Sequence, residues 1–449
     1  MTVKYSTRAM DVDSFRGGLR YIHGVTYRNI IMLTLLLYLY LLSPYFDVGG
    51  MLIHGGMISI FLFFVAHYRL VLRSFQQASL LLTLIGLCLF CLYNLILIIV
   101  YMEAFSTSFQ NYMIQVGIYI LLGFVLAFYM IDKALDLDQA LTLCFRLIAF
   151  VVFINAIIIL VEYHFPPFRQ FVESMLYQQE NTNINYLTRE YRLRGIASGG
   201  AANLSLFHGT VLVLLQALYI KRKIGLLYFL VASVTIFTSL LFIGRTGIVV
   251  GFIGIVLFHF LNLMMSRQKA SMRRVILYIS ISAIVVIAPP VFAMLFPDSL
   301  LGYSISFLYE GVEGIRQEGT VTTVASMFDM TGQWLKLLFG VGAHWGDFNL
   351  QGRVDAGYMR MFTALGIPLA VLFYLLIGYL ARFLLVITHY KSLWIVIMII
   401  MFIAEIKEPF IFKGYSARLM WMLIGMGICY TFCSPFYEEQ VKSTPRKSA

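Results

Sequence analysis

Charged residues are scarce in this sequence. Only 12% of its 449 residues are Asp, Glu, Lys or Arg, whereas 60% are hydrophobic and 16% are aromatic. So little charge excludes a large water-soluble domain, because such a domain needs a charged surface. The solvent of this chain is mostly lipid. The composition therefore predicts an all-α polytopic membrane protein, since helices satisfy their own backbone hydrogen bonds in a bilayer.

Nucleotide-binding and metal-binding motifs are also lacking. The sequence has no P-loop and no GxGxxG pattern after a strand, which excludes the common nucleotide folds. Its five cysteines lie in or beside apolar runs, and the close pair Cys88 and Cys91 lacks the further ligands that zinc requires. We expect these cysteines to be packing residues. A sugar donor, if the protein uses one, must bring its own leaving group, as a lipid-linked pyrophosphate does.

Apolar runs of about 20 residues, enough to cross about 30 Å of hydrocarbon, dominate the chain. Twelve spans are predicted within a single membrane domain over residues 1–449, and the first is a retained anchor because no small-residue cleavage site follows it. The predicted spans lie near residues 29–46, 50–68, 78–102, 112–131, 141–163, 197–219, 224–243, 246–265, 274–296, 357–387, 392–405 and 416–434.

The basic residues predict the orientation, because short loops rich in Lys and Arg stay inside. With both termini cytoplasmic, including a tail over residues 435–449, 21 of the 33 Lys and Arg residues fall on the inside. Topology and attraction to the membrane surface then explain the net charge of +11, so no nucleic acid partner is expected. The other twelve fall in or beside four outside connections: 164–196, 243–246, 297–356 and 405–416. An excess of cations on this side indicates an anionic ligand at the outer face.

The two long outside loops contain patterns of their own. In residues 297–356, apolar and polar residues alternate at helical spacing, which predicts one or two short amphipathic helices that form a lid or platform. A loop that only packs on the helix ends is the alternative. The loop 164–196 ends in RLRGIASGG, where Arg192 and Arg194 precede Gly195 and a helix start. Arginine forks and helix N-termini both bind phosphate, so this segment is a candidate pyrophosphate site; snorkelling or contact with lipid headgroups is the alternative.

An arginine flanked by glycines interrupts the apolar chain at GRTG. Gly244 and Gly247 permit a tight turn around Arg245 and Thr246, which places Arg245 at the outer interface facing a cavity. Pairing of Arg245 with a carboxylate or a helix-end carbonyl is the structural alternative.

Two further segments carry acid, base and ring side chains. GAHWGDFNLQGRVDAGYMR contains His344, Asp347 and Asp355 as candidate bases, although Asp355 also fits a helix N-cap. EIKEPFIFKGYSARLMW is broken by Pro409 and Gly414, which predicts a re-entrant turn beside protein or water. Its alternation of charges and rings is typical of a sugar-binding surface, and equally of an interfacial aromatic belt.

Together these four segments resemble the O-antigen polymerase (Wzy-type) family, which is related to the O-antigen ligases. The resemblance covers nearly the whole chain in topology and is carried by RLRGIASGGAANLS, GRTG, GVGAHWGDFNLQGRVDAGYMRMFTALGI and KEPFIFKGYSARLMW, in that order. It implies a GT-C-like, metal-independent glycosyltransferase of the bacterial inner membrane without a cofactor. Such an enzyme moves a growing oligosaccharide from one undecaprenyl pyrophosphate to another lipid-linked repeat unit at the periplasmic face.

The resemblance also implies roles for individual residues. Arg245 would act in catalysis by stabilising the leaving pyrophosphate, and His344 or Asp355 would deprotonate the acceptor hydroxyl. The partners implied are the lipid-linked donor and acceptor and membrane lipids, and a chain-length-regulating membrane protein is left open. The residues implied to bind pyrophosphate or sugar are Arg192, Arg194, Arg353, Arg360, Lys407, Glu408, Lys413, Tyr415 and Arg418.

Two other functions remain open at this point. The related ligases carry a polar residue after their loop histidine, whereas Trp345 follows His344 here. The base therefore stays unassigned among His344, Asp355, Glu405 and Glu408. A ligase would use similar arginines. A flippase would place its charges along a central path rather than at the outer helix ends. A twelve-helix sugar carrier would show a long basic central loop and internal repeats, whereas the connection after the sixth predicted span is short and no repeat is found. Sugar identity and anomeric outcome cannot be read from the sequence.

Overall fold

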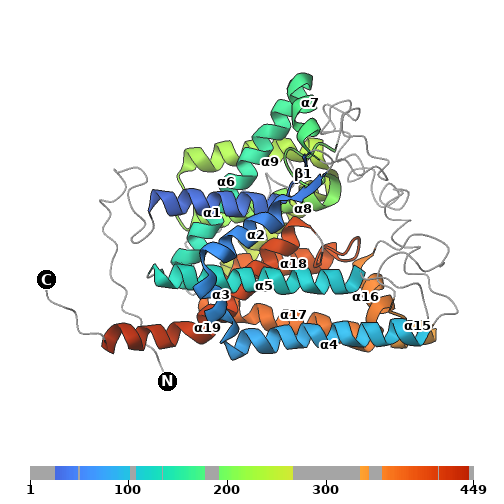
Figure 1. Cartoon of the computed structure of the whole chain (residues 1–449). Coiled ribbons are helices and arrows are strands. Elements are labelled where there is room, and N and C mark those ends of the chain that lie inside the picture. The colour runs from blue at the N-terminus through green and yellow to red at the C-terminus, as the bar shows by residue number, and fades with distance from the viewer. Residues whose placement is uncertain are drawn as a thin grey trace.

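The computed structural model describes residues 26–48, 51–101, 108–133, 135–176, 192–265, 334–342, 356–412 and 414–443. Within these ranges the chain is a bundle of helices with one small hairpin (Figure 1). In the described ranges, eight helices are long and apolar enough to cross a membrane. They are α4 (Ala78–Tyr101), α5 (Ser108–Asp132), α6 (Leu137–His164), α8 (Ala201–Ile220), α9 (Leu226–Ile243), α10 (Arg245–Met265), α17 (Ile367–Ile387) and α19 (Tyr415–Ser443). The prediction of a multi-pass helical protein is confirmed at this level.

Shorter elements complete the described part. The apolar helices α1 (Tyr27–Leu42) and α18 (Lys391–Ala404) fall below the length of a full span. Strands β1 (Tyr45–Val48) and β2 (Met51–His54) form an antiparallel hairpin. The remaining short helices are α2 (Gly55–Ala66), α3 (Tyr68–Phe75), α7 (Pro166–Met175), α15 (Trp334–Phe339) and α16 (Gly357–Leu365).

Two predicted spans are wrong in detail. The run 50–68 is not one straight helix, because β2 occupies its start and α2 is bent by 89° from α3. The run 357–387 is interrupted at Gly366, whose φ of +79° is in the left-handed region and separates α16 from α17, which begins at Ile367 with Pro368 as its second residue. The predicted span 274–296 and most of the loop 297–356 lie outside the described residues, and α15 is the described helix of that loop.

Small residues set the closest helix crossings. In α8 and α10, Ser205, Gly209, Gly247 and Gly251 form two small-xxx-small pairs, and a Cβ atom on Gly247 would overlap the backbone carbonyl of Ser205. Lipid offers no hydrophobic force to join helices, so close backbone approach and van der Waals contact must hold them. Gly247, the second glycine of GRTG, therefore permits the close packing of α8 and α10.

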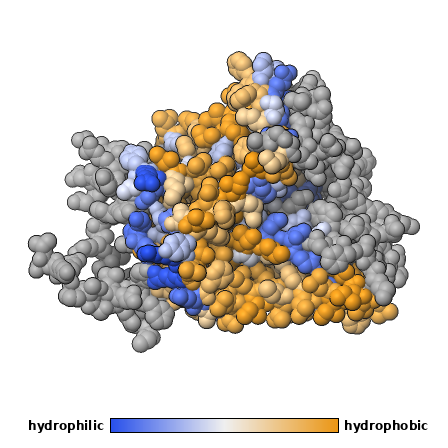
Figure 2. Space-filling view, viewed as in Figure 1, coloured by the Kyte–Doolittle hydropathy of each residue, from blue (hydrophilic) through white to orange (hydrophobic). Residues whose placement is uncertain are grey.

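Helices α5 and α19 form the centre of the bundle. Residues 122–131 of α5 are all buried, as is most of the described apolar part of α19. Their crossing again depends on glycine, because a Cβ atom on Gly123 would overlap the Met422 carbonyl and one on Gly425 would overlap the Ile120 carbonyl. Outer helices such as α4 expose leucines and isoleucines, as expected for a surface in contact with lipid. Figure 2 shows this broad hydrophobic surface across the middle of the molecule.

The connections between helices gather at the two ends of the bundle. At the far end (left in Figure 1), Lys221 donates to the carbonyl of His389 at 2.8 Å, and Thr388 and the His389 N–H both donate to Asp138 at 2.9 Å. At the opposite end, called the site end below, the segments 43–54, 192–200, 243–246 and 405–415 meet. Segments that the basic-residue pattern assigned to one side of the membrane thus lie together, which positions their polar side chains for a common site.

Candidate functional site

The segment 192–200 is bonded to the end of α9. The N–H groups of Arg192 and Leu193 donate to the Phe242 carbonyl at 2.6 and 3.1 Å. Phe242 lies three residues before Arg245, so these bonds bring the RLRG segment beside GRTG although 50 residues separate them in the sequence. The Arg192 side chain is exposed, whereas that of Arg194 is buried. Two arginines that alternate in the sequence therefore have different environments.

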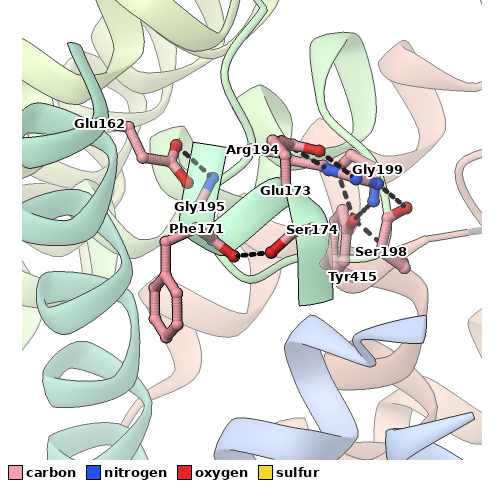
Figure 3. Close-up of polar contacts among 9 residues, drawn as sticks. All are labelled: Glu162, Phe171, Glu173, Ser174, Arg194, Gly195, Ser198, Gly199 and Tyr415. Carbon is pink, nitrogen blue, oxygen red and sulfur yellow. Dashed lines mark hydrogen bonds and ion pairs between the residues drawn. The ribbon is translucent and has the colours of Figure 1, made fainter. Parts of the chain in front are cut away.

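Arg194 forms a buried ion pair with Glu173 of α7 (Figure 3). Its Nε donates to Glu173 Oε1 at 3.1 Å and its Nη2 donates to Oε2 at 2.5 Å, a bidentate geometry in which both side chains are only 3% exposed. Arg194 Nη1 also donates to the Ser198 carbonyl at 3.4 Å. The charge of Arg194 is thus matched within the chain, and the pair joins α7 to the 192–200 segment.

A turn at Gly195 places its backbone against α6. Gly195 has φ of +59°, and its N–H donates to Glu162 Oε2 at 3.2 Å (Figure 3). A Cβ atom at this position would overlap Asn155 Oδ1. The next N–H, of Ile196, donates to Asn155 Oδ1 at 3.1 Å. Only glycine fits both this φ and this space. Two polar side chains of α6, Asn155 and Glu162, therefore hold the backbone of the segment at Gly195 and Ile196.

Tyr415 closes the other end of this segment (Figure 3). Its hydroxyl donates to the Gly199 carbonyl at 2.5 Å, accepts the Gly199 N–H at 2.8 Å and lies 3.2 Å from Ser198 Oγ. The Ser198 N–H donates to the Leu42 carbonyl at 3.0 Å. The start of α19 and the end of α1 thus anchor the residues just before α8. In this structure Tyr415 acts as an anchor of the loop.

GRTG forms the sharp connection between α9 and α10. Ser205 Oγ accepts the Gly247 N–H at 2.6 Å and donates to the Gly244 carbonyl, so a side chain of α8 caps both helix ends. Arg245 is the first residue of α10 and is half-exposed. Lys407 Nζ donates to Thr246 Oγ1 at 3.4 Å, which joins this turn to the segment after α18.

Three basic residues that keep access to solvent therefore lie in neighbouring segments: Arg192, Arg245 and Lys407. We call them the cation cluster. They come from three regions of the sequence, and the backbone and side-chain bonds described above bring those regions together at the site end. Beside them, α10 begins at Arg245, and a helix N-terminus adds partial positive charge. The arrangement suits a ligand with more than one negative charge.

A buried carboxylate supports the segment after α18. Glu405 is fully buried, its Oε1 accepts from the Tyr374 hydroxyl at 3.2 Å, and its Oε2 accepts the Ile411 N–H at 2.8 Å. Burial raises the pKa of Glu405 to about 8, although these hydrogen bonds and the nearby Arg360 act in the opposite direction. Its carbonyl accepts the Gly357 N–H at 2.9 Å. Glu405 therefore links the start of α16 to this turn.

Arg418 is a second arginine whose donors are used within the chain. Its Nη1 donates to the carbonyls of Leu41 and Tyr40 at 2.9 and 3.4 Å, and its Nε donates to the Tyr119 hydroxyl at 3.4 Å. The Tyr40 hydroxyl in turn donates to the Arg418 carbonyl at 2.8 Å. Arg418 holds the C-terminal end of α1 against α19.

The predicted site residues thus divide by exposure. Arg192, Arg245, Lys407 and Glu408 are exposed or half-exposed at the site end. Arg194, Arg360, Tyr415 and Arg418 are buried there. The predicted residues His344, Arg353, Asp355 and Lys413, together with Asp347, lie outside the described residues.

Two acidic residues of this end, Glu162 and Glu173, were not predicted as site residues from the sequence. They line a cavity of about 290 Å³ between α6 and α7 together with Arg169. A signal for Glu162 was present, because an ionisable residue inside a predicted span marks a partnered or functional position. Glu173 lies in a loop sequence where nothing distinguishes it from a solvated carboxylate.

Comparison with known proteins gave no match to a protein family, to a curated protein or to a solved structure.

Proposed function

We propose that this chain is a glycosyltransferase of the bacterial inner membrane that polymerises undecaprenyl-pyrophosphate-linked repeat units into O-antigen or a related surface polysaccharide. The observation that carries the proposal is the cation cluster, formed by three distant segments at one end of a lipid-embedded bundle. A pyrophosphate attached to a lipid is an anion that reaches such a position from the bilayer. The resemblance to O-antigen polymerases supplies the reaction.

In this reaction a hydroxyl of the acceptor sugar attacks the anomeric carbon of the donor. The bond from that carbon to the pyrophosphate oxygen breaks, the glycosidic bond forms, and undecaprenyl pyrophosphate leaves with the bonding electron pair. Arg192, Arg245 and Lys407 stabilise the negative charge that develops on this leaving group. Loss of one such stabilising group costs about 10²–10³ in rate in well-studied enzymes.

The acceptor proton needs a base. The resemblance implies His344 or Asp355 for this role. Glu405 is poorly placed to act directly, because both its carboxylate oxygens already accept hydrogen bonds and the side chain is fully buried. We assign Glu405 a positioning role: it holds the backbone at Gly357, two residues after Asp355 in the sequence. His344 and Asp355 remain the proposed bases.

A gel profile of lipopolysaccharide tests the proposal. A strain lacking the gene is complemented with wild type, with Arg245→Ala, or with Arg69→Ala as a matched control that removes an exposed arginine of α3. We expect the ladder of long chains with wild type and Arg69→Ala. Arg245→Ala should give only core carrying one repeat unit, at equal protein level in the membrane.

Each other outcome identifies a competing function. Bare core in the deletion strain would point to the ligase, which passes finished polysaccharide to lipid A-core, or to the flippase. Long chains of normal distribution from Arg245→Ala would contradict the role of the cation cluster.

A further inference from the structure

An apolar groove runs along the lipid-facing side of α17. It consists of two adjoining cavities, of about 560 and 630 Å³, that share Tyr358, Gly378 and Phe402. These volumes are within the range of small-molecule sites, about 300–1,000 Å³. Along α17 the lining extends from Val371 to Leu385, which is about 21 Å at 1.5 Å per residue, roughly two-thirds of the hydrocarbon thickness.

The groove is open to the bilayer and lacks a side chain at its middle. Leu375 and Tyr379 on its wall are 65% and 49% exposed. A Cβ atom on Gly378 would meet nothing within 4 Å. The space at Gly378 is therefore available to a flexible hydrocarbon chain that enters sideways from the membrane.

One end of the groove lies one residue along the chain from Lys407 of the cation cluster. Ile406 lines the cavity of about 560 Å³ beside Tyr358 and directly precedes Lys407, whose Nζ donates to Thr246 next to Arg245. Behind the groove wall, the Tyr374 hydroxyl donates to the buried Glu405, and the Tyr358 hydroxyl donates to the Phe402 carbonyl at 2.7 Å. An apolar channel that ends at cations matches a ligand with a long hydrocarbon tail and an anionic head.

We infer that this groove holds the isoprenoid chain of a polyprenyl pyrophosphate, with the pyrophosphate at the cation cluster. The inference rests on the proposed function, since it names where the lipid part of the donor lies. A phospholipid acyl chain fits the apolar part equally well. The polyprenyl chain is favoured because the two phosphates of its head match the three cations better than a single phosphodiester does.

Photocrosslinking tests this placement. The full-length protein in nanodiscs carries benzoylphenylalanine at Leu375 in the groove, or at Leu82, a leucine of α4 that is 68% exposed. The probe is radiolabelled undecaprenyl pyrophosphate. We expect labelling at position 375 but not at 82, and competition by unlabelled undecaprenyl pyrophosphate but not by phosphatidylglycerol.

Two results would overturn the inference. Equal labelling at both positions, or competition by phosphatidylglycerol, would make the groove an ordinary lipid-facing surface. A crosslink from position 375 to another part of this chain, such as the predicted span 274–296, in place of the lipid label would make the groove a helix-packing surface.

A substitution that fills the groove gives an independent test. Gly378→Leu should lower labelling about tenfold or more, which corresponds to about 1.4 kcal/mol. Gly86→Leu is the matched control, because a Cβ atom on Gly86 in α4 also meets nothing within 4 Å but Gly86 lies outside the groove. Unchanged labelling with Gly378→Leu would refute the placement.

Labelling is a binding measurement, so its failure is separable from failure of the proposed function. Loss of the ladder in the deletion strain without labelling at position 375 would support the proposed polymerase function and refute the placement of the isoprenoid chain in the groove. Labelling at position 375 together with an intact ladder in the deletion strain would support a polyprenyl pyrophosphate site and refute the proposed polymerase function.

Discussion

The buried pair of Glu173 and Arg194 gives the sharpest structural prediction. Both side chains are 3% exposed and joined by two hydrogen bonds, so Arg194→Ala removes the bidentate partner of a buried carboxylate. Breaking a buried pair by removal of one partner costs about 3–5 kcal/mol. We expect Arg194→Ala to lower the free energy of unfolding of the detergent-solubilised protein by this amount, measured as a lower melting temperature, and to release the 192–200 segment.

The double variant separates anchoring from ligand binding. Glu173→Gln with Arg194→Met removes both charges, so it should recover much of the stability that either single change loses. If the pair only anchors the loop, the double variant also recovers polymer in the gel profile. A stable double variant that makes no polymer would show that Arg194 contacts the substrate, as the resemblance implies. Wild-type stability in Arg194→Ala would refute the pairing itself.

Two further predictions concern packing and pH. Gly247→Ala should lower the melting temperature, at a cost of about 1–3 kcal/mol in the free energy of unfolding, because the new Cβ atom overlaps the Ser205 carbonyl. Gly251→Ala should be tolerated, since its Cβ atom makes ordinary contacts from 3.5 Å. Equal melting temperatures for the two variants would contradict the described crossing of α8 and α10. Burial raises the pKa of Glu405 to about 8 from an ordinary value near 4.5, so its contribution to stability is full below pH 4.5 and is lost as the pH rises through 8. Glu405→Gln should therefore flatten the fall in melting temperature between pH 5 and 8, and an unchanged pH profile would show that Glu405 does not titrate there.

Hydropathy predicted the helices of this fold well, but not their interruptions. Long apolar runs such as α5 and α6 appear within a few residues of the predicted spans, since about 20 apolar residues need a helix to satisfy their backbone in lipid. The bend between α2 and α3 and the break at Gly366 leave hydropathy unchanged, because they depend on backbone conformation. The hairpin β1–β2 was also not predicted, since strands this short carry little periodic signal.

The sequence predicted which segments contain site residues, but not which of their side chains are buried and which are exposed. Three of the four predicted motifs, RLRG, GRTG and KEPF, contribute to the site end, and they were predictable because basic residues in connections assigned to the outside are unusual. The central part of the fourth motif, residues 343–355, lies outside the described residues. The pattern RLR could not show which arginine faces outward, since that depends on the backbone conformation of a turning segment in which Arg192 has φ of +69°. It also could not show that Arg194 meets Glu173, a partner 21 residues away on α7.

The most direct test of the central claim is polymerisation by the isolated protein. The full-length chain is reconstituted in nanodiscs with a purified undecaprenyl-pyrophosphate-linked repeat unit as both donor and acceptor. We expect products of two, three and more repeat units, with one undecaprenyl pyrophosphate released for each bond formed, and none with Arg245→Ala. A folded wild-type protein that forms no product longer than one repeat unit, with substrate that other polymerases accept, would contradict the account.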